Sequence, residues 1–376
     1  MTAWLYEANA LDLPLDDNSV DLVVTSPPYY ALRSYQDGSK HYEGQIGSEA
    51  TAQEWLDALW AATAECIRVL KPSGSIFVDL GDRYVKKGLL GLPWRYAIGC
   101  IDDLGLILRA EVIWSKPNAI PESIKDRVRR SHDQWFHFTL EPRYFSAIDE
   151  IREPYTSAPA KAQPSKAFAA GATRNPALSY DHDLKHNPLG KLPGSVWSIP
   201  TEPLRVPDDL GVEHFAAFPQ EWPRRLILGW CPAEVCTACG QGRAPVVDKE
   251  LVDVWHDKPV ESSRYADESY ANHPNKNKIA GQFKRFGKTA ATIVGYACAC
   301  PDTTAPSTPG VVLDPFCGTG TVPMVAHALG RTGIGVDLSG DYLRLARWRV
   351  FESGHAQKSI DRTAANVRAR NSEGGG

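Results

Sequence analysis

The sequence has no long apolar run, which argues against a membrane protein. Hydrophobic residues make up 43% of the chain, but no segment approaches the roughly 18 consecutive apolar residues that a membrane-spanning helix requires. The first residues, Met1-Thr2-Ala3-Trp4, contain neither the basic nor the apolar stretch of a secretory signal. We therefore expect an intracellular protein with a sizeable core and no membrane partner.

A surplus of positive charge is also missing. The chain has 41 Lys and Arg residues against 45 Asp and Glu residues, a formal net charge of −4. Such a chain is not a general binder of polyanions, so contact with nucleic acid would depend on local basic segments. Two segments qualify, and a solvated basic loop is the alternative interpretation of the second. The candidate phosphate contacts are Lys125, Arg127, Arg129 and Arg130 in the first segment, and Lys276, Lys278, Lys284, Arg285 and Lys288 in the second.

Disulfide bonds are not expected, because the eight cysteines belong to a chain predicted to be intracellular. Four of them form two closely spaced pairs, Cys236 with Cys239 and Cys298 with Cys300. Four thiolates are the ligand set of a closed, tetrahedral zinc site of the structural type. The spacing therefore predicts a structural Zn²⁺, and a set of unligated buried thiols is the alternative. Cys231 is a substitute ligand, although its place after the amphipathic stretch 222–230 favours packing.

Regular secondary structure is predicted in two parts of the chain. Short β-branched runs predict strands at 21–24, 75–80, 108–114 and 138–145, and helical spacing of apolar residues predicts a helix at 51–70. After Gly310 the predicted order is strand 311–313, glycine turn 317–320, helix 321–329, strand 333–336 and helix 342–350. Alternating strands and helices predict a parallel α/β sheet. The stretches 151–194 and 241–295 lack periodicity and are expected to be irregular.

The segment from Asp314 to Thr321 has the features of a cofactor turn. Its glycines allow a ligand to approach the backbone, and the following helix presents free N–H groups. The next strand ends in Asp337, where a carboxylate can bind a ribose diol. These features fit a dinucleotide or S-adenosylmethionine. The second is favoured, because Pro323 breaks the GxGxxG spacing and Asp314 would repel a pyrophosphate but suits a cation.

Several motifs together resemble one enzyme family. DPFCGTGT followed by GIGVDLS resembles the S-adenosylmethionine-binding motifs of amino-methylating DNA methyltransferases, and TSPPYY resembles their catalytic tetrapeptide. The catalytic motif comes first, which is the circularly permuted order of the family's β group. The Lys71-Pro72-Ser73-Gly74 turn, IWSKPNAIPES, VWSIP and HFAAFP fit as well, so the resemblance covers roughly 5–150, 195–232 and 309–350.

This resemblance implies a fold, a cofactor, partners and a set of cofactor contacts. The implied fold is a Rossmann-like α/β methyltransferase domain with permuted motif order and irregular insertions. The implied cofactor is S-adenosylmethionine, and the implied partners are double-stranded DNA and a cognate restriction endonuclease in the cytoplasm of a prokaryotic or phage-infected cell. The cofactor contacts carried over are Asn9, Thr25, Asp314, Phe316, Gly318, Gly320, Thr321, Asp337 and Leu338. Family members often have Gly-Asp where this chain has Ala8-Asn9, so Asn9 departs from the pattern.

The catalytic tetrapeptide Ser26, Pro27, Pro28 and Tyr29 suits methylation of an exocyclic amine. Such a nitrogen is a poor nucleophile because its lone pair is delocalised into the ring, and hydrogen bonds taken from its N–H groups make it more reactive. Ser26 offers a side-chain oxygen, Pro27 offers a carbonyl held rigid by Pro28, and Tyr29 can stack on a flipped base. No covalent intermediate or catalytic metal is needed. A Pro-Cys dipeptide is absent, so Cys317 is interpreted as a turn residue rather than as the nucleophile of a carbon-5 cytosine methyltransferase.

The target base and three other functions remain open at this stage. Ser-Pro-Pro tends to accompany cytosine N4 methylation in the resembling families, so N4 of cytosine is predicted and N6 of adenine is the alternative. Methylation of RNA or of a protein glutamine is disfavoured by the permuted order. A non-catalytic, zinc-dependent DNA-binding protein is disfavoured by the intact Gly318, Gly320 and Asp337.

Six segments are predicted along the chain. They are a catalytic half at 1–150, a target-recognition region at 151–194, a return to the methyltransferase core at 195–232, a cysteine-bracketed insertion for zinc and DNA at 233–305, an S-adenosylmethionine-binding half at 306–355, and a disordered tail at 356–376. Recognition of specific bases is expected from the irregular stretches, because loops on a rigid scaffold carry recognition.

Overall fold

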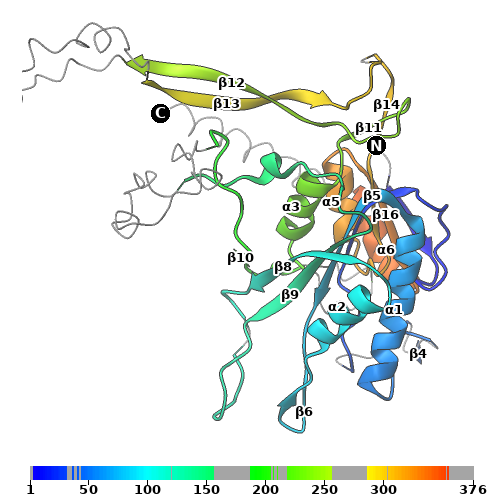
Figure 1. Cartoon of the computed structure of the whole chain (residues 1–376). Helices are drawn as coiled ribbons and strands as arrows, with labels where there is room; N and C mark the ends of the chain where they lie inside the picture. Colours follow the sequence, from blue (N-terminus) through cyan, green and yellow to red (C-terminus); the bar gives the residue numbers. More distant parts are fainter. Residues whose placement is uncertain are drawn as a thin grey trace, which may run out of the picture. The chain divides into compact units, whose positions relative to one another are not determined.

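The chain forms two units in a computed structural model (Figure 1). The structure describes residues 3–31, 36–37, 40–41, 44–119, 121–155, 187–204, 206, 210, 218–255, 286–302, 304–352 and 354. The first unit comprises residues 1–151, 192–245 and 296–376, and the second comprises 152–191 and 246–295. Within the described residues, no helix is both long enough and apolar enough to cross a lipid bilayer.

The first unit is built on an eight-stranded sheet. Its order is β1 (Ala3–Glu7), β16 (Thr332–Asp337), β15 (Val311–Asp314), β2 (Val20–Thr25), β5 (Leu70–Leu80), β9 (His132–Thr139), β8 (Ile107–Ser115) and β10 (Val196–Ser198). β9 is antiparallel to both of its neighbours, and every other pairing in the sheet is parallel. The α/β fold expected from the sequence is confirmed.

Helices cover both faces of this sheet (Figure 1). α1 (Ala52–Val69) and α2 (Leu92–Asp102) pack on one face, whereas α3 (Glu221–Trp230) and α5 (Thr321–Ala328) pack on the other. Strands between two helical layers must be apolar on both faces. β2 illustrates this, because Val23 joins the first core while Leu22 and Val24 join the second.

Local sequence explains where the helices begin. α1 starts at a reciprocal capping box, in which Thr51 Oγ1 accepts from the Glu54 N–H at 3.2 Å and Glu54 accepts from the Thr51 N–H at 3.0 Å. α6 (Gly340–Arg347) is capped by the Ser339 hydroxyl, which accepts from the Tyr342 N–H at 3.1 Å. A π-helical turn, Trp348–Glu352, follows α6. The predicted helices at 51–70, 321–329 and 342–350 are therefore present within a few residues.

Two predicted strand boundaries were wrong. The strand expected at 138–145 lies at 132–139 as β9, which has polar residues such as Asp133 and His137 inside it. These side chains have partners in neighbouring elements, so they do not end the strand: His137 Nε2 lies 3.1 Å from Ser75 Oγ. The segment 71–74, expected as a turn, belongs to β5, and a register irregularity between Val20 and Leu22 accommodates it.

The N-terminal and C-terminal parts of the chain meet at the centre of the sheet, where β2 pairs with β15. The Asp21 carboxylate accepts from the Val311 N–H at 2.8 Å and forms an ion pair with Lys71 at 2.7 Å. At the other end of these strands, Thr25 Oγ1 donates to Asp314 Oδ1 at 2.7 Å. Two segments about 290 residues apart therefore end at the same edge of the sheet.

Hairpins and short ribbons complete the described structure. They are β3 (Gln36–Asp37) with β4 (Lys40–His41), β6 (Tyr84–Val85) with β7 (Gly88–Leu89), β11 (Glu234–Cys236) with β14 (Ser307–Pro309), and β12 (Ala244–Trp255) with β13 (Phe286–Ala297). A 3-10 turn lies at Ile148–Ile151. The β12–β13 ribbon corrects the expectation that 241–295 is irregular, because all of β12 and the first ten residues of β13 fall within that stretch.

Candidate active site

A pocket of about 770 Å³ opens at the carboxyl ends of β2, β5, β15 and β16. This edge of an open parallel sheet is where ligands usually bind. The pocket wall includes Ser26 and Tyr29 from the loop after β2, and Gly318 and Asp337 from the opposite side. The predicted catalytic and cofactor segments, separated by 289 residues at Thr25 and Asp314, therefore line one pocket.

Asp337 organises the cofactor side of this pocket. Its carboxylate accepts from the Gly318 N–H at 2.8 Å and from the Ser339 N–H at 2.9 Å, and burial raises its pKa to about 6. Gly320 lies at φ +75°, where an added Cβ would come within 2.7 Å of Ala346 Cβ. Only glycine fits this turn without strain and a clash. The carboxylate and the turn are consequently fixed against each other.

The nine predicted cofactor contacts divide into two groups. Asn9, Phe316, Gly318, Thr321, Asp337 and Leu338 line the pocket. Thr25, Asp314 and Gly320 lie behind its wall instead: Asp314 is 1% exposed, and burial raises its pKa to about 7. Asp314 accepts from the Thr25 hydroxyl and from the Phe316 N–H at 3.1 Å. It therefore links the strand that precedes the catalytic segment to the cofactor turn.

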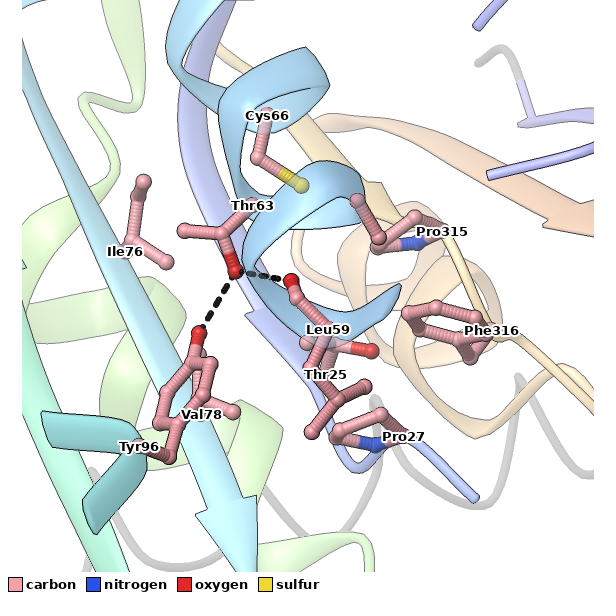
Figure 2. Close-up of a pocket in the computed structure, with 11 residues that line it drawn as sticks. Thr25, Pro27, Leu59, Thr63, Cys66, Ile76, Val78, Tyr96, Pro315 and Phe316 are labelled. Atoms are coloured by element: carbon pink, nitrogen blue, oxygen red, sulfur yellow. Dashed lines mark hydrogen bonds between the residues drawn. The ribbon is translucent and has the colours of Figure 1, made fainter. Parts of the chain in front are cut away.

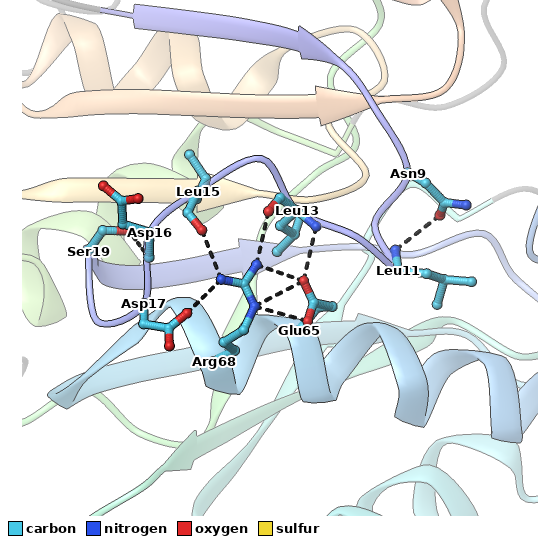
Figure 3. A network of polar contacts seen from close by, with 9 residues as sticks. All are labelled: Asn9, Leu11, Leu13, Leu15, Asp16, Asp17, Ser19, Glu65 and Arg68. Atoms are coloured by element: carbon cyan, nitrogen blue, oxygen red, sulfur yellow. Dashed lines mark hydrogen bonds and ion pairs between the residues drawn. The ribbon is translucent and has the colours of Figure 1, made fainter.

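Hydrogen bonds from Arg68 of α1 hold the loop that carries Asn9 in place (Figure 3). The Arg68 guanidinium donates to the carbonyl oxygens of Leu13 and Leu15 at 2.9 and 2.8 Å, and it pairs with Glu65 at 2.8 Å. The Asn9 Oδ1 accepts from the Leu11 N–H at 3.0 Å. Because this local turn uses Oδ1, the Asn9 amide nitrogen Nδ2 is the part of that side chain available to a ligand.

The predicted catalytic segment, Ser26 to Tyr29, is called the catalytic loop below. Its inner side packs on α1 and the cofactor turn around a small cavity (Figure 2). The cavity measures about 10 Å³, about the space of one water molecule. On its wall, Thr63 Oγ1 lies 2.7 Å from the Tyr96 hydroxyl. Trp55 of α1 donates its indole N–H to the Pro28 carbonyl at 3.0 Å. Close support of this kind holds the loop in one conformation.

Two buried carboxylates converge on the catalytic loop. Asp79, near the end of β5, accepts from Ser26 Oγ at 3.3 Å. The Tyr29 hydroxyl lies 3.1 Å from Asp79 Oδ2 and 3.2 Å from Asp133 Oδ2 of β9. Burial and the nearby Asp133 hold the pKa of Asp79 well above its usual range, and burial with both carboxylates raises the pKa of Tyr29. A group with a raised pKa can hold a proton near neutral pH.

Cations compensate the charge of this carboxylate pair. Lys116 forms an ion pair with Asp133, and Arg130 Nη2 lies 3.6 Å from Asp133 Oδ1. Sequence reasoning missed Asp79, Asp133 and Lys116. The available signal for Asp79 was an acid within the apolar run 75–80, which requires a buried partner. Asp133 gave no usable signal, because β9 was placed six residues too late.

The structure describes the first basic segment but almost none of the second. Lys125, Arg127, Arg129 and Arg130 lie in the connection between β8 and β9, and Arg130 lines the pocket. Lys276, Lys278, Lys284 and Arg285 lie outside the described residues. Lys288 is in β13, but its side chain is not among those described.

Three of the four predicted zinc ligands come together. The sulfur atoms of Cys236, Cys239 and Cys298 all lie within 4.8 Å of one another, and Cys239 Sγ is 3.8 Å from Cys298 Sγ. A tight turn shapes the first pair, since the Gly240 N–H donates to the Cys236 carbonyl at 2.8 Å. The Cys300 sulfur is not within this group, and Cys231 is buried apart from it. Three thiol donors at these distances fit a zinc ion.

Comparisons with known proteins bear on this pocket. A family model described as DNA methylase, of the N6/N4 type, matches residues 20–234 and 302–347. The chain is 33% identical over 254 residues to the type II methyltransferase M.XycI of Xanthomonas campestris pv. cyanopsidis, covering 59% of this chain and 71% of that protein. It is 25% identical over 366 residues to the type II methyltransferase M.SmaI of Serratia marcescens, covering 90% and 86%.

One solved structure extends the comparison to the fold. It is described as PvuII DNA methyltransferase (cytosine-N4-specific), and it superposes with a TM-score of 0.55 at 17% identity. The match covers 96% of this chain and 93% of that chain. At this level of identity the likeness concerns the architecture alone.

Proposed function

Because this chain belongs to the N6/N4 DNA methylase family and is an S-adenosylmethionine-dependent DNA methyltransferase, we propose that it methylates the exocyclic N4 of a cytosine flipped out of duplex DNA. The observation that carries the proposal is the single pocket lined by Ser26 to Tyr29 and by the Asp337 turn. A base held by the first set faces a cofactor held by the second. Such positioning alone contributes about 7–11 kcal/mol to lowering a barrier.

Ser26 and Pro27 prepare the amino nitrogen for reaction. Bound S-adenosylmethionine supplies an electrophilic methyl group. Ser26 Oγ donates its own proton to Asp79 at 3.3 Å, so its lone pairs are free to accept from an amino N–H. The Pro27 carbonyl accepts the second N–H, which draws the nitrogen lone pair out of conjugation with the ring.

Asp79 is the proposed destination of the proton that the methylated nitrogen releases. The proton moves to Ser26 Oγ while the Ser26 proton moves to Asp79, so the charge on nitrogen is neutralised. The raised pKa of Asp79 makes the carboxyl a competent acceptor. Tyr29 lies close against Gly81, where an added Cβ would overlap one edge of its ring, so that edge is held in place. We assign the face of the ring to stacking on the base.

On the cofactor side, we assign the ribose hydroxyls to Asp337. Each of its carboxylate oxygens already accepts one backbone N–H and keeps a second lone pair for a ligand. Phe316, Leu338 and the Asn9 amide supply the surrounding surface. Equilibrium binding of S-adenosylmethionine should be lost in Asp337→Ala and retained in Ser26→Ala.

The choice of cytosine rests on Ser26, and adenine N6 is the alternative, because the same hydrogen bonds serve either amino group. Long-read sequencing of DNA from cells expressing the protein identifies the base, its position and the site. Transfer of radiolabelled methyl groups to duplex DNA should be abolished in Ser26→Ala. A parent protein that labels no DNA, or a variant as active as the parent, contradicts the proposal.

We also propose that Cys236, Cys239, Cys298 and Cys300 bind a structural Zn²⁺. The ion would join the knuckle at the end of β11 to the segment after β13. Metal analysis should find about one zinc per chain in the parent and in Cys231→Ser, whose sulfur lies apart from the cluster. Cys239→Ser should lose the ion. Equal zinc content in both variants, or none in the parent, would contradict the assignment.

The remaining assignments concern partners and segments. We propose that Lys125, Arg127, Arg129 and Arg130 contact the DNA backbone, together with the basic segment 276–288. The six-segment division described above remains our interpretation of the chain. Relatives named type II methyltransferases support a cognate endonuclease as a partner in a prokaryotic cytoplasm.

A further inference from the structure

The connection between β8 and β9 exposes an apolar side chain, Val128, near the rim of the pocket. Lys116, Asn118 and Arg130 of this connection line the pocket. Val128, two residues before Arg130, is 87% exposed, the highest value among the large apolar side chains that the structure describes. Two residues span at most about 7 Å of chain, so Val128 is close to the pocket wall.

Arginines brace the backbone on both sides of Val128. Arg127 lies over the Tyr84 ring at 3.7 Å, pairs with Glu122 at 2.8 Å, and donates to the Val128 carbonyl at 3.0 Å. Arg129 donates to the Ala119 carbonyl at 2.8 Å. Arg130 donates to the Asp82 carbonyl and lies near Asp133. The valine is therefore held outward by a fixed backbone, although its side chain has little to pack against.

The charge around Val128 suits a polyanion. Lys125 and Arg129 are exposed, and neither forms an ion pair with an acid in the described part of the chain. The exposed acid next to Lys125, Asp126, is paired with Lys87 at 3.6 Å. Cations that flank an apolar side chain match the DNA duplex, where phosphates lie on either side of an apolar base stack. A purely apolar protein partner would not need them.

We propose that Val128 is a wedge that enters the duplex and fills the space left by the flipped base, while Lys125 and Arg129 bind the neighbouring phosphates. This inference rests on the proposed function. Flipping leaves a gap in the stack, and the open state is short-lived unless something occupies it. A compact apolar side chain on a braced loop can occupy that gap with little loss of conformational freedom. Val128 is thus a positioning residue that does not touch the reacting atoms.

Single-turnover methylation of two synthetic duplexes carrying the mapped site tests the wedge. One duplex has the target base normally paired, and the other has it opposite an abasic site, where flipping breaks no base pair. Val128→Ala should react about tenfold more slowly than the parent on the paired duplex and within about twofold of it on the other. Val128→Leu should retain the parent rate on both. Fluorescence of 2-aminopurine at the target position should rise less with Val128→Ala.

Val196→Ala is the matched control, because Val196 is 62% exposed but belongs to strand β10, paired with β8, and not to the basic connection. It should behave as the parent, and both alanine variants should melt at the parent temperature. Val128→Ala at the parent rate on the paired duplex, or slowed equally on both duplexes, would overturn the wedge while leaving the proposed function intact. A parent that methylates neither duplex would overturn both.

Discussion

Asp79→Asn isolates the charge of the carboxyl beneath the catalytic serine. The amide has the same shape and keeps an acceptor oxygen for Ser26, which lies 3.3 Å from Asp79 Oδ2. It cannot become an anion or take up a proton. If Asp79 receives the proton of the methylated amine, kcat should fall while the affinity for S-adenosylmethionine stays at the parent value.

The geometry sets the size of the effect. An amino nitrogen bonded to Ser26 Oγ would lie about 3 Å beyond it, and so about 6 Å from the carboxylate. A pair of unit charges at that distance interacts by about 3 kcal/mol at an effective dielectric constant of about 20. Between half and all of the positive charge has developed on the nitrogen at the transition state. Loss of the attraction in Asp79→Asn should therefore lower kcat by about 10- to 100-fold.

The pH dependence gives a second readout. Because the pKa of Asp79 in the folded protein is raised, the parent kcat should increase with pH through a value above the ordinary range of an aspartate. Asp79→Asn should lack this limb. Asp133→Asn is the matched variant, because Asp133 contacts Tyr29 but not Ser26. It should keep the limb but move it to lower pH, because the charge of Asp133 helps to raise the pKa of Asp79.

Stability should move in the opposite direction to activity. A carboxyl whose folded pKa lies above its unfolded value contributes stability below the unfolded pKa, and that contribution is lost as pH rises through the folded pKa. Above the folded pKa the parent carries the cost of a buried, ionised carboxylate. Asp79→Asn removes this cost, so its melting temperature at pH 8 should equal or exceed that of the parent. A kcat within twofold of the parent, with the acidic limb unchanged, would refute the role of Asp79.

Three further predictions concern the pocket and the residues behind its wall. Gly81→Ala should lower kcat at least tenfold without loss of cofactor binding, measured by methyl transfer and equilibrium binding, because its Cβ would displace the Tyr29 ring. Gly320→Ala should lower the free energy of unfolding by about 2 kcal/mol in urea titrations, since φ is +75° and Ala346 is in the way. Affinity for S-adenosylmethionine should rise with pH through about 6, the pKa of Asp337, and Asp337→Asn should show weak, pH-independent binding by calorimetry.

The sequence by itself determined the fold class and the two ends of the pocket. A short apolar run stopped by Pro27 and Pro28, and a glycine turn before a helix, are local signals, since chain geometry and periodicity over a few residues define them. The same holds for the helix at 51–70, whose cap at Thr51 lies beside the residues that it satisfies. The order of the motifs was enough to suggest the methyltransferase family.

Other features could not be predicted from local patterns. β9 is buried on both faces and contains Asp133 and His137, so its polar residues resembled loop signals. The β12–β13 ribbon was missed in a stretch interpreted as irregular. In both cases the strand is stabilised by pairing with a partner distant in sequence, which single-segment periodicity does not register.

Only the tertiary structure decided how the catalytic loop is completed. Ser26 and Tyr29 come from one segment, but Asp79 lies about 50 residues away and Asp133 about 100, and the sheet order alone brings them together. It likewise moved Asp314 from the pocket wall to a buried bond with Thr25. Hydrogen bonds across a sheet depend on strand order and register, and both are set by the packing of the whole domain rather than by the residues nearest to each motif.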